Sequence, residues 1–121
     1  MKLKNINKTV IFEQTKQYSY RDPAAYYYNG CIYLYFTLVE QIEDHQFFYI
    51  GMSTSTDMVN WSTPVKLTKR NSALDYSSPG NILEKDGIFY MCMQTYCRPN
   101  GEVFGNQDSR IFFMKSKNLL D

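Results

Sequence analysis

Residues 20–37 read YRDPAAYYYNGCIYLYFT, and this stretch decides the expected fold class. Two aromatic runs flank Asn29-Gly30, a pair that readily takes the positive φ angles of a tight hairpin turn. Tyrosine, phenylalanine and β-branched residues suit the pleated, half-buried surface of a sheet better than a helix. We therefore predict an antiparallel hairpin with strands at 24–28 and 31–39.

The rest of the chain continues as short β-type runs separated by turns, and few windows carry a helical period. Asp86-Gly87 is expected at the tip of a second hairpin. Residues 40–45 read as an acidic loop, and residues 97–109 as a loop rich in Gly, Pro and Asn. The predicted fold class is therefore all-β, with further strands at 9–14, 46–54, near 64–68, 80–85, 88–96 and 110–120.

The composition allows one domain with a hydrophobic core, because the chain has 121 residues of which 44% are apolar and 17% aromatic. The formal net charge is +1 and the basic residues are scattered. This pattern argues against nucleic acid and against an anionic membrane as partners. No stretch has the length of a membrane span or the form of a signal peptide, so we expect a cytoplasmic protein.

The sequence offers few residues for metal, cofactor or triad chemistry. Cys31, Cys92 and Cys97 are odd in number and match no metal spacing, so we expect structural thiols and no cofactor. His45 is the single histidine and lies in the acidic loop. The sequence therefore has too few histidines for a multi-histidine metal site, and only His45 could serve in a Ser-His-Asp triad.

The chain also contains an internal repeat. The corner at Pro23 recurs at Pro79, and the hairpin turn at Gly30 recurs at Gly87 with a separation that is longer by a single position. Two Ser-x-Asp/Asn turns, which begin at Ser55 and Ser116, follow in the same order. Each unit reads as four strands, and four-stranded units near this period are typical of the blades of a β-propeller.

We expect a single partial β-propeller domain over residues 1–121. Blade one would occupy about residues 18–70. Blade two would occupy about residues 74–121 and would be incomplete, because the sequence stops where a counterpart of Trp61 is due. Two blades alone would leave apolar sheet faces uncovered. We expect self-association or further, C-terminal blades to cover these faces.

Three stretches, YRDPAAYYYNGCIYLYFT, STDMVNW and SSPGNILEKDGIFYMCMQTY, resemble the five-bladed β-propeller glycosidases, in particular glycoside hydrolase family 43 and its relatives. The Arg-Asp-Pro triplet also resembles a motif of the invertase-type families, whose fold is similar. The resemblance covers about residues 18–120. It implies a carbohydrate substrate, either an oligosaccharide or a polysaccharide.

The resemblance implies that Asp22, which opens the inner strand of blade one, acts as the general base of an inverting hydrolysis. Pro23 is expected to stiffen the corner and to hold the carboxylate at a strand end. Arg21 would keep Asp22 ionised by charge proximity. The matching position of blade two is Ser78, which adds no carboxylate. In the family the general acid and a helper carboxylate come from later blades.

Carbohydrate sites combine aromatic faces with planar polar side chains and arginine. Asp75 precedes the second corner and is expected in a solvated loop, and the same holds for Glu102 and Asp108 in the long loop. The predicted sugar-binding residues are Tyr20, Arg21, Ser78, Gln94, Tyr96 and Arg98.

Three interpretations stay open at this point. The chain is part of a glycosidase propeller, a carbohydrate-binding or self-assembling β module without cleavage activity, or an all-β sandwich whose repeat is coincidental. An inverting glycosidase needs two carboxyl groups in different roles. Asp22 alone cannot fill both, so the chain by itself is not expected to hydrolyse a glycoside.

Overall fold

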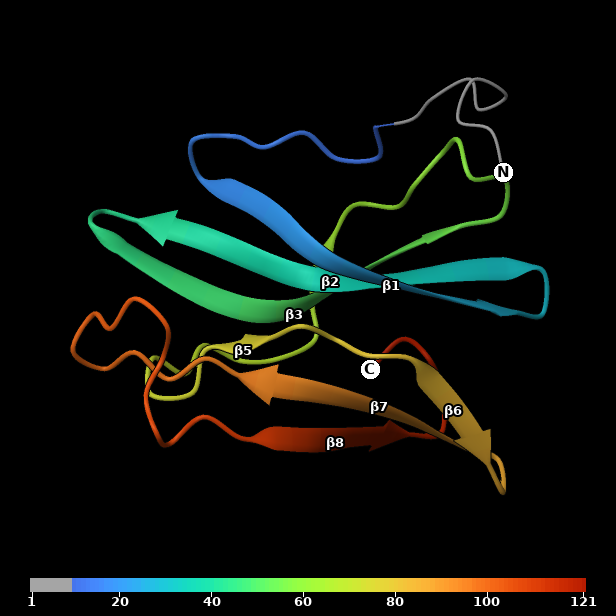
Figure 1. Cartoon of the computed structure of the whole chain (residues 1–121). Helices are drawn as coiled ribbons and strands as arrows, with labels where there is room; N and C mark the ends of the chain where they lie inside the picture. The colour runs from blue at the N-terminus through green and yellow to red at the C-terminus, as the bar shows by residue number, and fades with distance from the viewer. Residues whose placement is uncertain (1–9) are drawn as a thin grey trace.

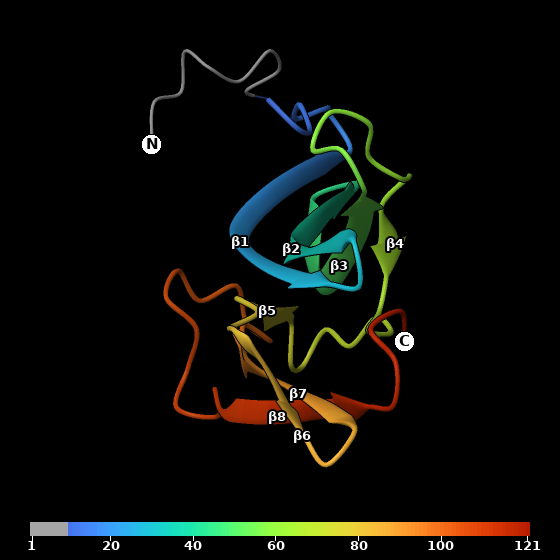
Figure 2. The ribbon, with the colours of Figure 1, turned by 90° about the vertical axis from the view of Figure 1, so that its right-hand side faces the viewer.

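Two antiparallel four-stranded sheets lie face to face in the computed structural model, which describes residues 10–121 (Figures 1 and 2). The first sheet has the order β1-β2-β3-β4. In the second, β7 pairs with β5 and β6 along one edge and with β8 along the other. The prediction of an all-β fold is confirmed. The strands are β1 (Tyr18–Tyr28), β2 (Cys31–Ile42), β3 (His45–Ser55), β4 (Val65–Lys66), β5 (Tyr76–Ser77), β6 (Ile82–Lys85), β7 (Ile88–Thr95) and β8 (Ile111–Ser116).

The two sheets repeat the same pairing register. Thr37 of β2 pairs with Ile50 of β3, and Gln94 of β7 pairs with Ile111 of β8. Thr37 and Gln94 have the same separation as the turn residues Gly30 and Gly87. Ile50 and Ile111, in turn, have the same separation as Ser55 and Ser116. Below, two residues of the hairpin strands are called equivalent when they have the separation of Gly30 and Gly87. Two residues of the third strands are called equivalent when they have the separation of Ser55 and Ser116.

The turn after the third strand is also built alike in the two repeats. The Asp57 carboxylate accepts a hydrogen bond from the Val59 amide at 2.8 Å, and the equivalent Asn118 side chain accepts one from the Leu120 amide at 2.8 Å. The amides of Asn60 and Val59 hold the pKa of Asp57 well below its usual range. The Ser-x-Asp/Asn signature therefore marks equivalent turns.

The space between the sheets forms one part of the core. Tyr35, Ile50 and Met52 of the first sheet pack against Met91 and Met93 of the second. Methionine fills such irregular gaps well because its side chain is unbranched and flexible. Met91 and Met93 are both buried in this core.

A second cluster lies on the outer face of the first sheet, where Leu34 and Phe36 are buried beneath Ile11, Phe12 and Trp61. The strand expected at 9–14 is wrong over residues 10–14, because Ile11 and Phe12 cover the sheet without joining a ladder. Thr9 lies outside the described residues. The apolar run thus signalled burial rather than pairing.

Glu40 was expected in the acidic loop, but it lies inside β2 and only 6% of it is exposed. Its carboxylate receives hydrogen bonds from Lys66 Nζ at 2.8 Å, Tyr49 Oη at 3.0 Å, Tyr18 Oη at 3.1 Å and Arg70 Nη2 at 3.3 Å. Burial alone would raise the pKa of Glu40, but these partners outweigh it and lower the pKa to about 2. The network ties β4 and the following segment to the sheet.

Candidate functional site

The Arg-Asp-Pro corner forms a bulge in the middle of β1. Arg21 pairs with Thr37 and Ala24 pairs with Tyr35, so Asp22 and Pro23 together face a single residue of β2. Proline has no N–H for the ladder, which is why it lies at this break in pairing. The expectation that the carboxylate lies at a strand end is therefore wrong: Asp22 lies within the strand, with a φ of 52°.

The second sheet is interrupted at the equivalent place. Ser77 pairs with Gln94 and Ile82 pairs with Met91, and the residues between them leave the ladder. Between equivalent paired positions, three residues separate Arg21 from Ala25 and four separate Ser77 from Ile82. This one extra residue is why the two hairpin turns are further apart than the two prolines. Gly80 approaches β7 so closely that a Cβ atom there would lie 2.5 Å from a sulfur atom of that strand.

Asp22 and Ser78 share an unusual backbone conformation, because each precedes a proline and each has a positive φ, 52° and 50° respectively. Left-handed residues other than glycine are uncommon and cost about 1–3 kcal/mol each, and they gather at functional sites. The repeat therefore places a strained residue at the same point of each sheet.

These two residues meet across the sheet interface. Asp22 Oδ2 accepts a hydrogen bond from Thr37 Oγ1 at 2.7 Å and another from Ser78 Oγ at 3.2 Å. The Ser78 amide donates to Thr37 Oγ1 at 2.7 Å. Within residues 10–121, Asp22 Oδ1 has no hydrogen-bond partner. One carboxylate oxygen is thus fixed in place and the other is free to bind a ligand.

Asp22 is one of the residues that line a pocket of about 210 Å³, which we call the Asp22 pocket. Thr37, Gln46, Phe48 and Ser77 line it in addition to residues that the sequence had suggested. The structure thus brings together most of the predicted site, from both sheets and from the long loop. The predicted residues found here are Arg21, Asp22, Ser78, Gln94, Tyr96 and Arg98.

Tyr20 is not among the residues of the Asp22 pocket. Its ring packs against Phe12, with ring centres 5.1 Å apart, and against Phe36 at 5.6 Å, on the outer face of the first sheet. Successive side chains of a strand point to opposite faces, so Tyr20 and its neighbour Arg21 cannot both face the pocket.

Arg98 is held firmly beside the pocket. Its Nη2 donates to Asp75 Oδ2 at 3.3 Å, and its guanidinium carbon lies 4.4 Å from the centre of the Phe48 ring and 5.5 Å from that of Tyr96. Asp75 also accepts a hydrogen bond from the Phe48 amide at 3.2 Å. The ion pair therefore links the loop, the second sheet and β3 of the first sheet.

The expectation of a solvated Asp75 is wrong, since only 4% of the residue is exposed. Burial raises its pKa, and the Phe48 amide and the Arg98 guanidinium offset this only in part. No residue close to Asp75 in the sequence indicates this burial, because Arg98 lies 23 residues further along the chain.

Arg21 does not pair with Asp22: no salt bridge joins the two side chains in the described part of the chain. The Arg21 guanidinium carbon lies 5.8 Å from the centre of the Phe48 ring instead. The contact through which Arg21 was expected to keep Asp22 ionised is therefore not formed, because the Asp22 carboxylate is directed towards Thr37 and Ser78.

Unused hydrogen-bonding groups remain at the pocket. Ser77 Oγ and Arg98 Nε are buried without a partner in the described residues, and an unmet buried polar atom costs about 1–3 kcal/mol. Asp22 is the single carboxylate lining the pocket among residues 10–121, since Glu102 and Asp108 lie elsewhere in the β7–β8 loop.

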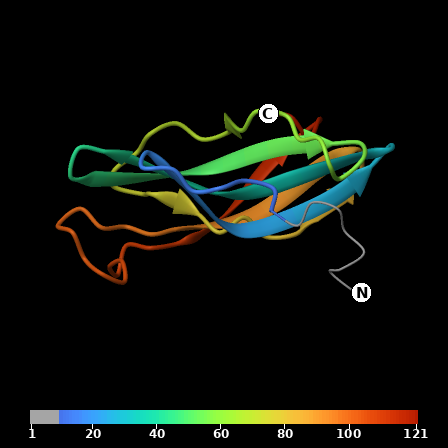
Figure 3. The same cartoon turned by 90° about the horizontal axis from the view of Figure 1, so that it is seen from above.

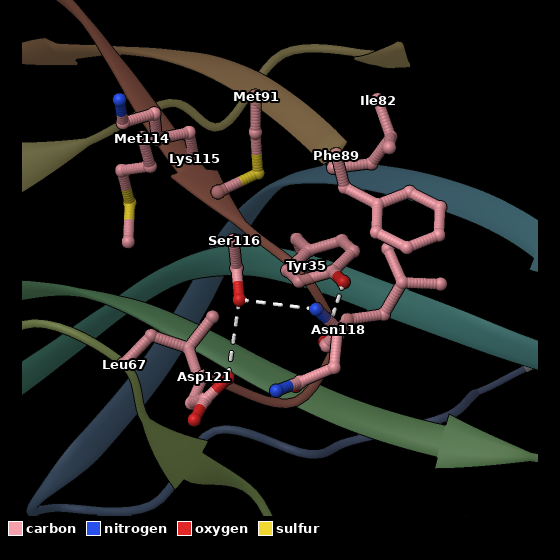
Figure 4. Close-up of a pocket in the computed structure, with 11 residues that line it drawn as sticks. Tyr35, Leu67, Ile82, Phe89, Met91, Met114, Lys115, Ser116, Asn118 and Asp121 are labelled. Atoms are coloured by element: carbon pink, nitrogen blue, oxygen red, sulfur yellow. Dashed lines mark hydrogen bonds between the residues drawn. The ribbon is translucent and has the colours of Figure 1, made fainter. Parts of the chain in front are cut away.

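A smaller cavity of about 100 Å³ lies between the sheets, near the end of the described chain (Figure 4). Met91, Met114 and Phe89 line it, and Tyr35 Oη donates to the Leu119 carbonyl at 2.7 Å across it. Lys115, Ser116, Asn118 and Asp121 add polar side chains to its mainly apolar lining. Residues 10–121 contain no group of three or more His, Cys, Asp or Glu placed to hold a metal ion, and no helix that is long and apolar enough to cross a membrane.

No family model matches the chain, and no curated protein matches it significantly. Its fold is similar to that of a glycosyl hydrolase from Bacteroides ovatus, at 24% sequence identity and a TM-score of 0.62 over 86% of this chain. A predicted glycoside hydrolase from Parabacteroides distasonis gives 22% identity and a TM-score of 0.56 over 84% of this chain.

A third solved structure belongs to work on the GH130 family of mannoside phosphorylases, which contains glycoside hydrolases that target β-1,2 mannosidic linkages in Candida mannan. It gives 18% identity and a TM-score of 0.58 over 86% of this chain. The chain spans 30% of the length of each of the three proteins. The chain therefore has the fold of part of a glycoside hydrolase-like protein, while family 43 and the number of blades stay predictions.

Proposed function

We propose that the chain provides a carbohydrate-binding site of the glycoside hydrolase type, centred on Asp22. The observation that carries the proposal is the Asp22 carboxylate itself: Thr37 and Ser78 hold it by one oxygen, and Asp22 lines a pocket. Charged acceptors form hydrogen bonds about twice as strong as neutral ones, which suits the recognition of sugar hydroxyls. The glycoside hydrolase-like fold supports the same class of ligand.

In a complete propeller of the family 43 type, Asp22 would act as the general base of an inverting hydrolysis. Its free Oδ1 would accept a proton from the attacking water, and a carboxylic acid about 6.5–9.5 Å away would protonate the leaving oxygen. The Asp22 pocket has no second carboxylate among the described residues. The chain on its own is therefore proposed to bind a glycan without cleaving it.

Calorimetric titration with two glycan series tests this proposal. One series consists of β-1,2-linked mannosides, the linkage named for the GH130 structure, and the other of β-1,4-linked xylosides as pentose counterparts. Asp22→Asn is expected to weaken binding about 10- to 100-fold, because a hydrogen bond to a charged group contributes about 1.5–3 kcal/mol. Asp108→Asn, in the exposed loop, is the matched control and should leave binding unchanged.

Circular dichroism and a thermal melt of Asp22→Asn show whether the contacts with Thr37 and Ser78 survive the substitution. A folded Asp22→Asn variant that binds as tightly as the original chain would contradict the proposal, as would a chain that binds neither series. No reducing sugar should be released by the chain alone, and its release would contradict the assignment of a single carboxylate.

A second candidate function, self-assembly, is favoured by an exposed apolar surface on the second sheet. Leu83, Ile111 and Phe113 are 63%, 79% and 73% exposed. Exposed apolar patches of this kind mark interaction surfaces in soluble proteins. We call this surface the open face; it consists of Leu83, Tyr90, Cys92, Ile111 and Phe113.

The repeat explains what the open face is suited to contact. The equivalent residues of the first sheet all lie in the core cluster between the sheets, namely Tyr26, Tyr33, Tyr35, Ile50 and Met52. The open face therefore has the residue pattern of a surface that packs against another sheet. We propose that the same face of a second copy covers it, because two-fold dimers are the commonest assemblies.

Light scattering after gel filtration tests the assembly. The chain is expected to be a dimer, and the double variant Ile111→Ser/Phe113→Ser is expected to be a monomer. Tyr27→Ser is the control, since Tyr27 is 69% exposed but lies on β1, outside the open face. A chain that is monomeric and cooperatively folded without any substitution would contradict this second function.

A further inference from the structure

We propose that residues 10–14, which we call the N-terminal arm, are a removable cover that keeps copies of this chain from joining head to tail. The surface beneath the arm, which we call the outer face, consists of Leu34, Phe36, Leu38 and Tyr49 of the first sheet. The partner that the arm excludes is the open face of a second copy. This inference rests on the self-assembly proposed above for the open face, and it says what limits that assembly.

The arm lies on the side of the first sheet that is turned away from the second sheet, as Figures 1 and 3 show. Ile11 and Phe12 pack there against the outer face, and the ring centres of Phe12 and Phe36 are 5.5 Å apart. With the arm in place, Leu34 and Phe36 are only 7% and 2% exposed. The arm therefore hides apolar side chains of a sheet to which it adds no strand.

The repeat shows what kind of surface the arm hides. Leu34 and Phe36 of β2 are equivalent to Met91 and Met93 of β7. These two methionines are the residues through which the second sheet packs against the first. The outer face therefore has the place in the repeat of a surface that receives a neighbouring sheet.

The open face corresponds to the other half of the same interface. Ile111 and Phe113 are equivalent to Ile50 and Met52, which pack against the second sheet. An interface of this kind between two copies would join the open face of one copy to the outer face of the next. The two surfaces are different, so the contact is heterologous, and heterologous contacts produce rings or open chains.

Hydrogen bonds do not hold the arm on the outer face. Within the part of the chain that the structure describes, residues 10–14 form no hydrogen bond with the sheet. The first bonds follow at the turn into β1, where the Thr15 amide donates to the Tyr18 carbonyl at 2.9 Å and the Tyr18 amide donates to Thr15 Oγ1 at 2.9 Å. The arm can therefore leave the sheet by local opening without breaking a ladder.

The arm also fits the outer face loosely. Val10, Ile11 and Phe12 of the arm line a cavity of about 310 Å³ together with Leu34 and Phe36 of the sheet. The cavity between the two sheets, by contrast, has about 100 Å³. Atoms that line a gap lose dispersion contacts. A second sheet would therefore cover the outer face more closely than the arm does.

The cover accounts for an assembly that stops at two copies. While the arm is in place, the open face of one copy meets the open face of another, which closes a two-fold dimer. Without the arm, each copy would present both halves of the heterologous contact. Association would then continue beyond two copies.

Light scattering and sedimentation velocity of an arm variant test the inference. Ile11→Ser/Phe12→Ser weakens the cover and leaves the outer face unchanged. The average mass should rise with concentration to at least about twice that of the original chain, because a contact between two different surfaces leaves one of each free at the ends of the assembly. Glu13→Ser/Gln14→Ser changes exposed residues of the same arm and should leave the mass unchanged.

Further variants locate the contact. Ile111→Ser/Phe113→Ser, added to the arm variant, should abolish the growth because it removes the apolar side chains of the open face. A photoreactive benzoylphenylalanine in place of Phe113 should cross-link to residues 34–38 of another copy in the arm variant, and to the open face in the original chain. Phe12→Ser alone is a milder arm variant, and circular dichroism shows whether each variant is folded.

The other outcomes separate the arm from the open face. A folded arm variant that stays dimeric would overturn the inference and leave the dimer intact. Growth that survives Ile111→Ser/Phe113→Ser would overturn it too, since another surface would then form the contact. Loss of the folded state in both arm variants would mean that the arm is part of the core and not a removable cover. If the original chain and the folded arm variants are all monomeric, the inference and the proposed self-assembly fail together.

Discussion

The two sheets of this molecule share a strand-pairing register but differ in the residue that each places before the proline of its interrupted strand. Both corners hold a residue with positive φ before a proline, Asp22 in the first sheet and Ser78 in the second. The hydroxyl of Ser78 donates to the carboxylate of Asp22. The first repeat therefore supplies a carboxylate, and the second supplies a hydroxyl that donates to it. The same backbone conformation thus carries side chains with two different roles.

The connections between equivalent strands also differ, at the edge of the site. The β2–β3 connection of the first sheet joins Ile42 to His45 through the two residues Glu43 and Asp44, whereas the equivalent β7–β8 connection runs from Thr95 to Ile111. The extra residues carry Arg98 to the Asp22 pocket. The repeated strands thus position the candidate site, and the longer β7–β8 connection adds residues to it that the first repeat does not have.

The sheets also differ in what covers them. In the first sheet Ile50 is fully buried against the second sheet, while the equivalent residue, Ile111, is 79% exposed on the open face. The two residues are chemically identical and have the same place in the repeat. They form a matched pair for measuring what coverage by a neighbouring sheet contributes.

Alanine substitution of this pair is expected to give the largest effect. Ile50→Ala should lower the free energy of unfolding by about 2–5 kcal/mol, because it leaves a cavity in the core. Ile111→Ala should change it by less than about 0.5 kcal/mol, as is usual for surface positions. Urea unfolding of both variants, followed by tryptophan fluorescence, provides the comparison.

The measurement belongs at low protein concentration, where an assembly through the open face would contribute little to stability. Equal losses for the two isoleucines would mean that the second sheet is covered as fully as the first in solution. That result would contradict the exposed position of Ile111 and break the contrast between the sheets.

A smaller effect is expected at Gly80, which lies in the extra-long interruption of the second sheet. A Cβ atom on Gly80 would lie 2.5 Å from Cys92 Sγ and 3.2 Å from the Cys92 carbonyl oxygen. Gly80→Ala should therefore cost about 1–3 kcal/mol through overpacking. Chemical unfolding gives the value.

The second substitution Cys92→Ala separates the two sources of that cost. It removes the sulfur atom but keeps the backbone, so Gly80→Ala should cost less in a Cys92→Ala chain than in the original chain. A cost that is the same in both chains would show that the close approach to the sulfur plays no part.

The strands of this fold could be predicted because their signals are local. Asn29-Gly30 and Asp86-Gly87 each close a hairpin, and Asn29 and Asp86 take the positive φ that such turns require. The repeat spacing then matched residues of the two sheets correctly. Residues 10–14 misled the prediction, since an apolar run that covers a sheet looks like a strand that joins it.

The site could be predicted only in part, because its decisive contacts join residues far apart in sequence. Asp22 and Ser78 are 56 residues apart, and Thr37 and Ser78 are 41 apart. The repeat marked both corners but could not show that they touch. Thr37 reads as an ordinary strand residue, and the burial of Asp75 depends on Arg98 from the distant loop.

The smallest expected effect concerns stability at low pH. The first sheet, but not the second, should become less stable as the pH falls. The pKa of Glu40 is lowered from 4.5 to about 2 by its partners, so its ionised form stabilises the folded state at neutral pH. That stabilisation is present above pH 4.5 and is lost as the pH falls towards 2. Glu40→Gln should therefore cost about 1–2 kcal/mol at pH 7 and almost nothing at pH 2.

Glu84→Gln is the matched control, because Glu84 lies exposed on β6 of the second sheet. Hydrogen exchange at pH 3 should show the amides of β2 and β3 opening before those of β7 in the original chain. In Glu40→Gln that order should already be seen at pH 7, because the substitution removes the carboxylate that Lys66 and Arg70 pair with in the first sheet. Simultaneous opening of both sheets at low pH would mean that they unfold as one unit, and that the repeats differ in chemistry but not in stability.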